Sequence, residues 1–512
     1  MLKFVTNFAA VFQGISLRTM WRTNCFKKII GIYLYMVEKT SRTHRPHPTW
    51  DSEEKSVFDK GIFFSARQAI QRHASGGNIL IAVTVLALVV ANIPGINHSY
   101  FEFWDQEVRL QLGDFNLFSH SGEPMTLLAF INDALMAIFF FSIGLEIKRE
   151  VLVGELSSFR QALLPIVGAL GGMIVPVSIF YFMSKGTDYS GGAAIPMATD
   201  IAFSLGVLAM LGKRVPVSLK IFLTTLAVVD DIGGIIVIAA FYSSHIDAML
   251  LVYAAALFGV LLLGSALRIK SKIFYLSIGG LIWFLFLNSG IHPTIAGVLV
   301  AFCVPATPVF APKKYIKIIR RSISHFSDDE PDDLERKSIL DKEQMNWLKE
   351  VESASDKVIS PLQDLEDTLH PTVNNFILPL FAFANAGIYL MDMSFVSIFE
   401  GLSLAIICGL MIGKFVGILG FSWLCVKLGL APMPAHSNWH MMSSIAMLGG
   451  IGFTVSLFIA TLSFDAMDPH QADLLAHSKL GIVCGSVISG VIAFLWLHLT
   501  LPKGVAPDAI DE

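Results

Sequence analysis

Residues 223–241 read LTTLAVVDDIGGIIVIAAF and place two adjacent aspartates, Asp230 and Asp231, inside an otherwise apolar run. The run belongs to a 25-residue apolar segment, 218–242, of which Asp230 is the thirteenth residue. A helix needs about 20 apolar residues to cross the hydrocarbon core of a bilayer. The stretch therefore predicts a membrane helix that carries two carboxyl groups near the midplane.

The composition of the whole chain agrees with a membrane protein. Of its 512 residues 54% are hydrophobic and only 15% are charged, where soluble domains average about 25% charged residues. The formal net charge of −4 is mild and gives no support to a nucleic-acid partner. Twelve apolar runs predict an all-α polytopic membrane protein of about 12 transmembrane helices, near residues 78–92, 127–145, 162–183, 194–211, 218–242, 249–267, 273–287, 291–305, 372–390, 401–424, 439–464 and 479–497.

Basic residues in the short loops predict the orientation of these helices. Loops after even-numbered runs hold Lys148, Arg149, Arg160, Lys213, Arg214, Arg268, Lys270 and Lys272. Loops after odd-numbered runs offer little beyond Arg109 and Lys185. Because basic loops stay in the cytoplasm, we expect both termini to be cytoplasmic.

We expect three regions: an N-terminal extension at 1–75, a twelve-helix domain at 76–500 and a cytoplasmic tail at 501–512. Residues 1–37 are basic and contain no Asp or Glu, which is typical of a transit peptide or a membrane-surface segment; alternatively, translation begins at Met36. Residues 98–125 alternate patchily and predict an outside loop with a hairpin. The long cytoplasmic loop 306–370 has mixed charge and predicts a solvated helix or linker, with a regulatory role as the alternative.

Several common chemistries find no support in the sequence. The five cysteines form no CxxC pair, so neither disulfides nor a zinc site are expected. Walker, GxSxG and HExxH motifs are absent from the sequence, which argues against ATP-driven pumping and common hydrolases. We expect no cofactor and a transporter rather than an enzyme.

The aspartate pair needs a physical explanation. An ionised Asp at a helix centre costs about 2.5–3.5 kcal/mol on insertion scales, so it requires a partner, a bound cation or water. Adjacent residues point about 100° apart on a helix, and Asp230 and Asp231 should therefore have different partners. A buried carboxyl group can hold a proton and release it when a cation arrives. The alternative is a salt bridge that only holds helices together.

Two further charges lie in midspan and are the obvious partners. Asp200 lies in AIPMATDIAFSLGVLAM and Lys414 lies in AIICGLMIGKFVGILGF; a midplane lysine nearly always pairs. MATDIAFSLG and AMLGGIGFTVSLF predict helices interrupted in the membrane, whose ends carry partial charges. Asp200 could offset the N-terminal ends and Lys414 the C-terminal ends. Alternatively, Lys414 is a structural tie and the glycines serve helix contacts.

Seven motifs together resemble the NhaA-type Na⁺/H⁺ antiporters from about residue 76 to 497: LAVVDDIGGIIVIAAFY, MATDIAFSLGVLAMLGKRVPVSLKIFL, INDALMAIFFFSIGLEIKRE, SGIHPTIAGV, ILPLFAFANAGI, LMIGKFVG and GGIGFTVSLFIATLSF. The resemblance implies inverted repeats in which helices 4 and 11 are unwound and cross. Phe415 departs from the family, which usually has Pro after the lysine. The 306–370 loop is also longer than in the family.

The resemblance also implies roles for residues. Asp231 would be the chief Na⁺/H⁺ carboxylate, and Asp230 would help to bind the transported Na⁺ or pair with Lys414, while Thr199 and Asp200 belong to the break in helix 4. A cytoplasmic cluster linked to pH activation would comprise Glu146, Arg149, Glu150 and Glu366; on its own this cluster reads as a positive-inside anchor. His292 matches a family histidine, and a helix-end histidine is the alternative.

The sequence thus predicts a secondary antiporter that uses the proton gradient to extrude Na⁺ or Li⁺ across a bacterial inner membrane. We expect electrogenic, pH-regulated exchange and a homodimer formed through residues 98–125. A transporter of the same fold for K⁺ or an organic anion is the main alternative. An intramembrane aspartyl protease needs facing acids and a GxGD motif, which the sequence lacks; a cation channel needs a filter-like repeat, which the sequence also lacks.

Overall fold

The computed structural model describes residues 76–109, 111–112, 115–116, 119–120, 123–243, 246–307, 312–324, 342–391, 395–465 and 468–502. The predicted extension at 1–75 and residues 503–512 of the tail lie outside this part of the chain. Two compact units emerge. The first holds the described residues up to Phe139, Glu155–Ser243 and those from Pro371 onward, and the second holds Phe140–Gly154 and the described residues of Ser244–His370.

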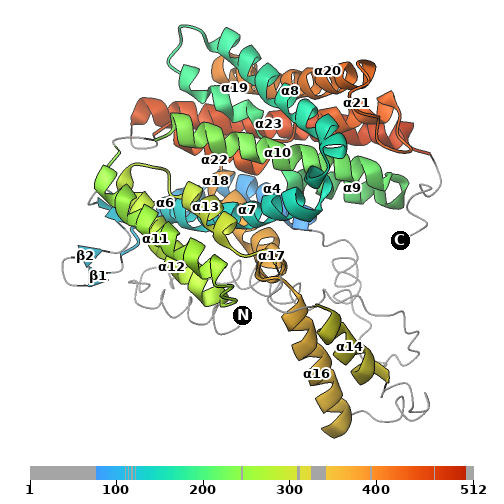
Figure 1. Ribbon diagram of the computed structural model, residues 1–512. Helices are drawn as coiled ribbons and strands as arrows, with labels where there is room; N and C mark the ends of the chain where they lie inside the picture. The colour runs from blue at the N-terminus through green and yellow to red at the C-terminus, as the bar shows by residue number, and fades with distance from the viewer. Residues whose placement is uncertain are drawn as a thin grey trace, which may run out of the picture. The chain divides into compact units, whose positions relative to one another are not determined.

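The first unit is built almost entirely of apolar helices (Figure 1). Its helices are α4 (Gly76–Asn92), α5 (Asn97–Trp104), α6 (Leu127–Phe130), η2 (Ile131–Leu135), η3 (Glu155–Ser157), α8 (Phe159–Ser184), η4 (Ser190–Met197), α9 (Ile201–Leu211), η5 (Gly212–Arg214), α10 (Val217–Phe241), η6 (Val373–Ile377), α18 (Leu378–Asn385), η7 (Phe395–Phe399), α19 (Gly401–Cys408), η8 (Gly409–Gly413), α20 (Lys414–Lys427), α21 (Trp439–Leu448), α22 (Phe453–Ser463) and α23 (Pro469–Thr500). Helix α7 (Met136–Val153) begins in this unit.

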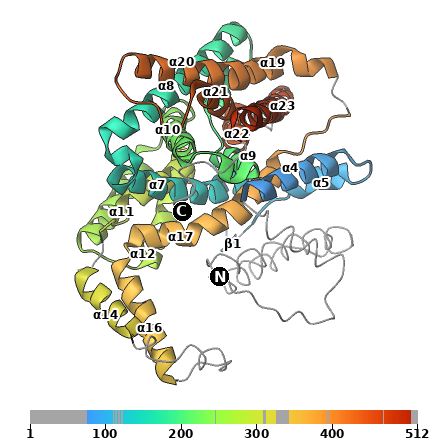
Figure 2. The ribbon, with the colours of Figure 1, turned by 90° about the vertical axis from the view of Figure 1, so that its right-hand side faces the viewer.

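Helices α8 and α20 lie side by side (Figures 1 and 2), and glycines allow them to pack closely. A Cβ added to Gly171 would lie 2.3 Å from the carbonyl oxygen of Gly417, and one added to Gly417 would lie 2.2 Å from that of Gly171. Small residues permit such backbone contact between membrane helices. These two glycines therefore bring α20 against α8 close to Lys414.

Residues 98–125 contain the only strands among the residues that the structure describes. Two short antiparallel ladders join β1 (Gln111–Leu112) to β2 (Phe115–Asn116) and β3 (Ser119–His120) to β4 (Glu123–Pro124). The hairpin prediction is confirmed, in the form of two short hairpins instead of one. Helix α5, which precedes them, was not predicted.

The second unit contains the rest of α7 and six further described helices. These are α11 (Ala248–Ala266), α12 (Lys272–Ser289), α13 (Thr294–Cys303), α14 (Pro312–Ser324), α16 (Lys342–Val358) and α17 (Pro361–Thr372), the last of which ends at the border of the unit. Helices α14 and α16 occupy the predicted 306–370 loop and pack against each other, as Figures 1 and 2 both show. The helical part of the loop prediction is therefore confirmed.

Judged by helix length and composition, the structure contains fewer candidate membrane helices than the twelve that the sequence predicts. Among the described residues eight helices are long and apolar enough to cross a membrane, or up to ten if each of two bent pairs forms one span. The predicted runs at 291–305 and 372–390 correspond to the short helices α13 and α18. The protein is an all-α polytopic membrane protein, while the count of twelve and the side of the termini stay predictions.

Candidate functional site

Two interrupted helices meet inside the first unit. The helix that starts with η4 gives way to extended backbone at Ala198 and Asp200 before α9 begins. Helices α21 and α22 are separated by residues 449–452, and the direction of the chain bends by 40° between the two helices. The amide of Asp200 donates a 2.7 Å hydrogen bond to the carbonyl oxygen of Ile451. The two breaks thus lie against each other, as the resemblance implied for helices 4 and 11.

Asp200 caps both helices that start at this crossing. Its Oδ1 accepts a 2.9 Å hydrogen bond from the amide of Phe203, in the first turn of α9. Its Oδ2 accepts from the amide and the hydroxyl of Thr454, in α22, at 2.9 and 2.6 Å. A carboxylate is stabilised by free amides at a helix N-terminus. The expectation that Asp200 offsets N-terminal ends is confirmed by these contacts.

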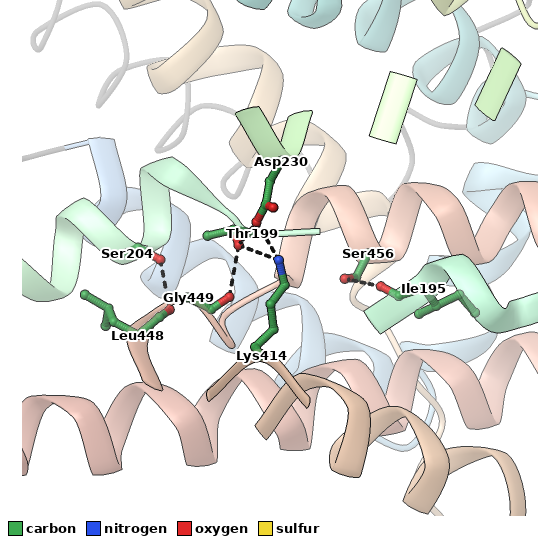
Figure 3. Close-up of polar contacts among 8 residues, drawn as sticks. All are labelled: Ile195, Thr199, Ser204, Asp230, Lys414, Leu448, Gly449 and Ser456. Atoms are coloured by element: carbon green, nitrogen blue, oxygen red, sulfur yellow. Dashed lines mark hydrogen bonds and ion pairs between the residues drawn. The ribbon is translucent and has the colours of Figure 1, made fainter. Parts of the chain in front are cut away.

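The carbonyl ends at the crossing are met by hydroxyl groups instead of Lys414 (Figure 3). Ser204 donates to the carbonyl oxygen of Leu448 at 3.3 Å, and Ser456 donates to that of Ile195 at 2.7 Å. Each serine lies in the first turn after a break and serves the helix end of the other interrupted span. The sequence interpretation missed both residues, and their signal is a hydroxyl one turn after each break.

Lys414 forms a buried ion pair with the first aspartate of the pair. Its Nζ lies 2.5 Å from Asp230 Oδ2 and donates to Thr199 Oγ1 at 2.9 Å. The Thr199 hydroxyl lies 2.6 Å from the same Asp230 oxygen and 3.0 Å from the Gly449 carbonyl oxygen. Figure 3 shows the three side chains converging from separate elements. Both partners of the ion pair have fully buried side chains.

A π-helical turn precedes the lysine. Residues Gly409–Gly413 form η8, which runs directly into α20 at Lys414. A Cβ on Gly413 would lie 2.6 Å from Pro176 Cα, so the turn packs directly on α8. Helices α19, η8 and α20 form one span of 27 residues, in which Phe415 is the second residue of α20. Such π turns are frequent at functional sites, and this one directly precedes Lys414.

Asp231 follows Asp230 on α10 and is 4% exposed. It interacts electrostatically with Lys414, but the hydrogen-bonded partner of Lys414 is Asp230. Asp230 Oδ1 is buried and accepts no hydrogen bond from a described residue. Hard cations prefer oxygen ligands, and this region offers carboxylate, hydroxyl and backbone oxygens. No three His, Cys, Asp or Glu side chains of the described residues converge as a metal site.

The predicted cluster of Glu146, Arg149, Glu150 and Glu366 forms within the second unit. Arg149 lies 2.9 Å through Nε from Glu366 Oε1 and 3.0 Å through Nη2 from Glu150 Oε1. Glu146 lies one turn before Glu150 on α7 and interacts electrostatically with Glu366 and Arg149. Burial raises the pKa of Glu366 above its usual value, and the charge of Arg149 opposes that rise. The structure therefore brings together all four residues of the predicted cluster.

His292 lies just before α13. Its Nδ1 is 2.8 Å from Thr294 Oγ1 and accepts a 3.4 Å hydrogen bond from the Thr294 amide. These contacts satisfy the start of α13 and match the interpretation of His292 as a helix-end histidine. The structure thus gives His292 a local bonding role.

Two broken membrane helices that meet beside a buried lysine–aspartate pair define a secondary transporter of ions rather than an enzyme. Comparison with known proteins agrees. Residues 67–497 match the family described as Na+/H+ antiporter 1, and the chain belongs to this family.

Curated relatives cover most of the chain. A Na(+)/H(+) antiporter NhaA from Phocaeicola vulgatus is 53% identical over 450 residues, which are 87% of this chain and 98% of the relative. The protein of the same name from Bacteroides fragilis is 54% identical over 428 residues, 83% of this chain and 96% of the relative. That from Bacteroides thetaiotaomicron is 52% identical over 425 residues, 83% and 94% of the two chains. None of the three is named as a protease, a channel or a transporter of another substrate.

Proposed function

We propose that the protein exchanges Na⁺ for protons at one site built on Asp230 and Asp231. The observation that carries the proposal is the buried ion pair between Lys414 and Asp230 at the crossing of two broken helices. A pair of this kind is costly to bury, and it lies where ion transporters of this architecture bind their substrates. Membership of the Na⁺/H⁺ antiporter family supports the same activity.

In the proposed mechanism, protons and Na⁺ compete for the same carboxylates. Asp231 is the chief shared carboxylate, because Asp230 already holds Lys414. The Thr199 hydroxyl can donate to Asp230 or to Gly449, but not to both at once. If this hydroxyl rotates towards Gly449, Asp230 loses one hydrogen bond, and its Oδ2 becomes free to accept another donor or to bind a cation. Access to the site then alternates between the two faces of the membrane.

Lys414 gives the exchange an electrogenic route. When Na⁺ binds the two carboxylates, Asp231 gives up its proton, and Lys414, which loses Asp230 as its counter-charge, gives up a second proton. Two protons are then exchanged for each Na⁺, so one net charge crosses the membrane per cycle. Li⁺ is a second expected substrate, since it is also a small hard cation that binds oxygen ligands.

The remaining assignments extend this proposal. We place the protein in a bacterial inner membrane, with the lipid bilayer around its apolar helices. The cluster of Glu146, Arg149, Glu150 and Glu366 regulates exchange by pH. The protein forms a homodimer through residues 98–125, where two two-stranded ladders offer strand edges for pairing with a second copy.

The decisive experiment uses purified protein in proteoliposomes that enclose a pH-sensitive dye. Addition of Na⁺ or Li⁺ should move protons, whereas K⁺ should not. Asp231→Asn should abolish this movement while the protein still inserts, and the matched change Asp473→Asn at an exposed aspartate should leave the rate intact. Normal exchange by Asp231→Asn would refute the site, and K⁺-driven proton movement would support the alternative substrate.

A further inference from the structure

Helix α14 has an unusual charge for one half of a helix pair. Its sequence, PKKYIKIIRRSIS, contains five basic residues and no acidic residue. Its neighbour α16, with the sequence KEQMNWLKEVESASDKV, contains three basic and four acidic residues. Positive charge is therefore concentrated on α14 alone, although both helices belong to the same loop.

The exposed face of α14 combines basic and apolar side chains. Lys317, Arg320 and Arg321 are exposed. Next to them on the helix, Ile316 and Ile323 are 48% and 52% exposed. This mixture is unfavourable in water but typical of a helix that lies at a membrane surface.

The opposite face of α14 is already occupied by α16. Ser322 is buried and donates a 3.0 Å hydrogen bond to Glu350 Oε2. Tyr315, Ile318 and Ile319 on this side are half-buried. By contrast, Lys317, Arg320 and Arg321 form no ion pair with another residue that the structure describes. Among the described residues, the outer face of α14 thus keeps its positive charge without an acidic partner.

The base of the α14–α16 pair is hydrogen-bonded next to the end of α13, a short apolar helix that lies in one of the predicted membrane spans. The amide of Leu362, in α17, donates a 3.2 Å hydrogen bond to the carbonyl oxygen of Pro305, two residues after α13. We call this contact the neck. The eight residues between α13 and α14 can span at most about 30 Å, so α14 starts within reach of the headgroup layer.

We propose that the outer face of α14 binds anionic lipid headgroups of the cytoplasmic leaflet. Lys317, Arg320 and Arg321 contact headgroup phosphates, while Ile316 and Ile323 insert at the boundary with the acyl chains. Basic clusters next to a membrane helix bind anionic lipid in this way, and each basic residue strengthens binding roughly fivefold. The long loop is then a lipid-binding element, a role that does not depend on the antiport proposal.

The test measures amide hydrogen exchange of residues 312–324 in the full-length protein. The protein is placed in nanodiscs of phosphatidylcholine alone or of phosphatidylcholine mixed with phosphatidylglycerol. Exchange in α14 should be at least about fivefold slower in the anionic nanodiscs. One molar salt should remove this difference, because it screens exposed charges beyond about 3 Å.

Paired variants separate specific binding from a change in net charge. Lys317→Glu with Arg320→Glu should abolish the slowing in anionic nanodiscs. Lys342→Glu with Lys349→Glu on α16 changes the net charge equally and should retain the slowing. Ile316→Ser with Ile323→Ser should weaken it without a change in charge. Unaltered α14 exchange in phosphatidylcholine shows that each variant still folds.

Three outcomes would overturn the proposal. Equal exchange of parental α14 in both kinds of nanodisc would exclude a preference for anionic lipid. The same slowing produced by inorganic phosphate in phosphatidylcholine nanodiscs would show that phosphate alone suffices. Loss of slowing in the α16 variant would assign the effect to overall charge. Exchange of Na⁺ for protons is measured separately, so a failed antiport proposal would leave these results interpretable.

Discussion

Two buried aspartates in the first unit, Asp200 and Asp230, differ in how fully their carboxyl oxygens are hydrogen-bonded. Asp200 accepts three hydrogen bonds from the starts of two helices, so its charge is matched by fixed dipoles. Asp230 has one oxygen held by Lys414 and Thr199 and a second oxygen without a hydrogen bond from a described residue. Asp200 is therefore suited to holding the crossing together, and Asp230 is suited to exchanging its partner.

Lys414 and Asp230 should depend on each other for stability. Lys414→Ala leaves Asp230 as an unpaired buried charge, and we expect a loss of about 3–5 kcal/mol. The double variant Lys414→Ala with Asp230→Asn should recover part of this loss, because neither charge remains alone. Thermal unfolding in detergent measures both changes.

The same variants test the proposed transport role of Lys414. If the lysine carries a proton, Lys414→Ala should still exchange Na⁺ for protons but should no longer generate a membrane potential. A potential-sensitive dye in proteoliposomes reports the difference. If Lys414→Ala is as stable as the parent protein and its exchange still generates a membrane potential, then Lys414 neither stabilises the fold by pairing with Asp230 nor carries a transported proton.

At the scale of elements, each of the two interrupted spans donates a serine hydroxyl to a backbone carbonyl group of the other. Ser456→Ala leaves the carbonyl group of Ile195 without its hydroxyl partner, which costs about 1–3 kcal/mol. Ser204→Ala should cost less, because the Leu448 carbonyl oxygen also accepts a hydrogen bond from the amide of Ile451. Ser456, with the shorter contact of 2.7 Å against 3.3 Å, should show the larger fall in melting temperature. Ser178→Ala is the control, because that serine bonds only within its own helix. Equal melting of all three variants would contradict a role in the crossing.

The sequence predicts some of these elements well and others poorly. Pro196 and the glycines at 449, 450 and 452 mark both breaks, because they interrupt helical hydrogen bonding or weaken it. The π turn before Lys414 also begins and ends with a glycine, Gly409 and Gly413, but the sequence interpretation did not identify it. Both glycines pack closely on prolines of other segments, Pro196 and Pro176, and these contacts are visible only in the fold. Spacing showed that Asp230 and Asp231 need different partners, but only the fold shows that Lys414 bonds to Asp230. Helices α13 and α18 are too short to count as membrane spans in the structure, although their apolar runs are long enough in the sequence. Hydropathy alone does not indicate where within an apolar run a helix begins.

At the scale of the whole molecule, transport should respond to pH through the second unit. Burial favours the protonated form of Glu366, so the described conformation loses stability as pH rises through the raised pKa. Arg149 lowers that pKa; Arg149→Gln should therefore raise it and move half-maximal exchange to higher pH. Dye-based exchange rates across pH measure the shift.

Two controls complete this test. Glu366→Gln cannot ionise at this position and should flatten the response to pH. Lys272→Gln removes a different ion pair of the second unit, the one with Asp364, and should leave the midpoint in place. If Arg149→Gln leaves the dependence of exchange rate on pH unchanged, the cluster does not regulate transport and serves only as a positive-inside anchor.

The crossing also sets an order of events during biosynthesis. The amide of Asp200 bonds to Ile451, and Lys414 lies 184 residues after Asp230. At about 5–20 residues per second, the ribosome makes the first interrupted span tens of seconds before its partners. During that interval its helix ends and carboxyl groups lack the contacts that Lys414, Ile451, Thr454 and Ser456 supply in the finished protein. A nascent chain halted between residues 242 and 414 should therefore be a preferred target for membrane proteases.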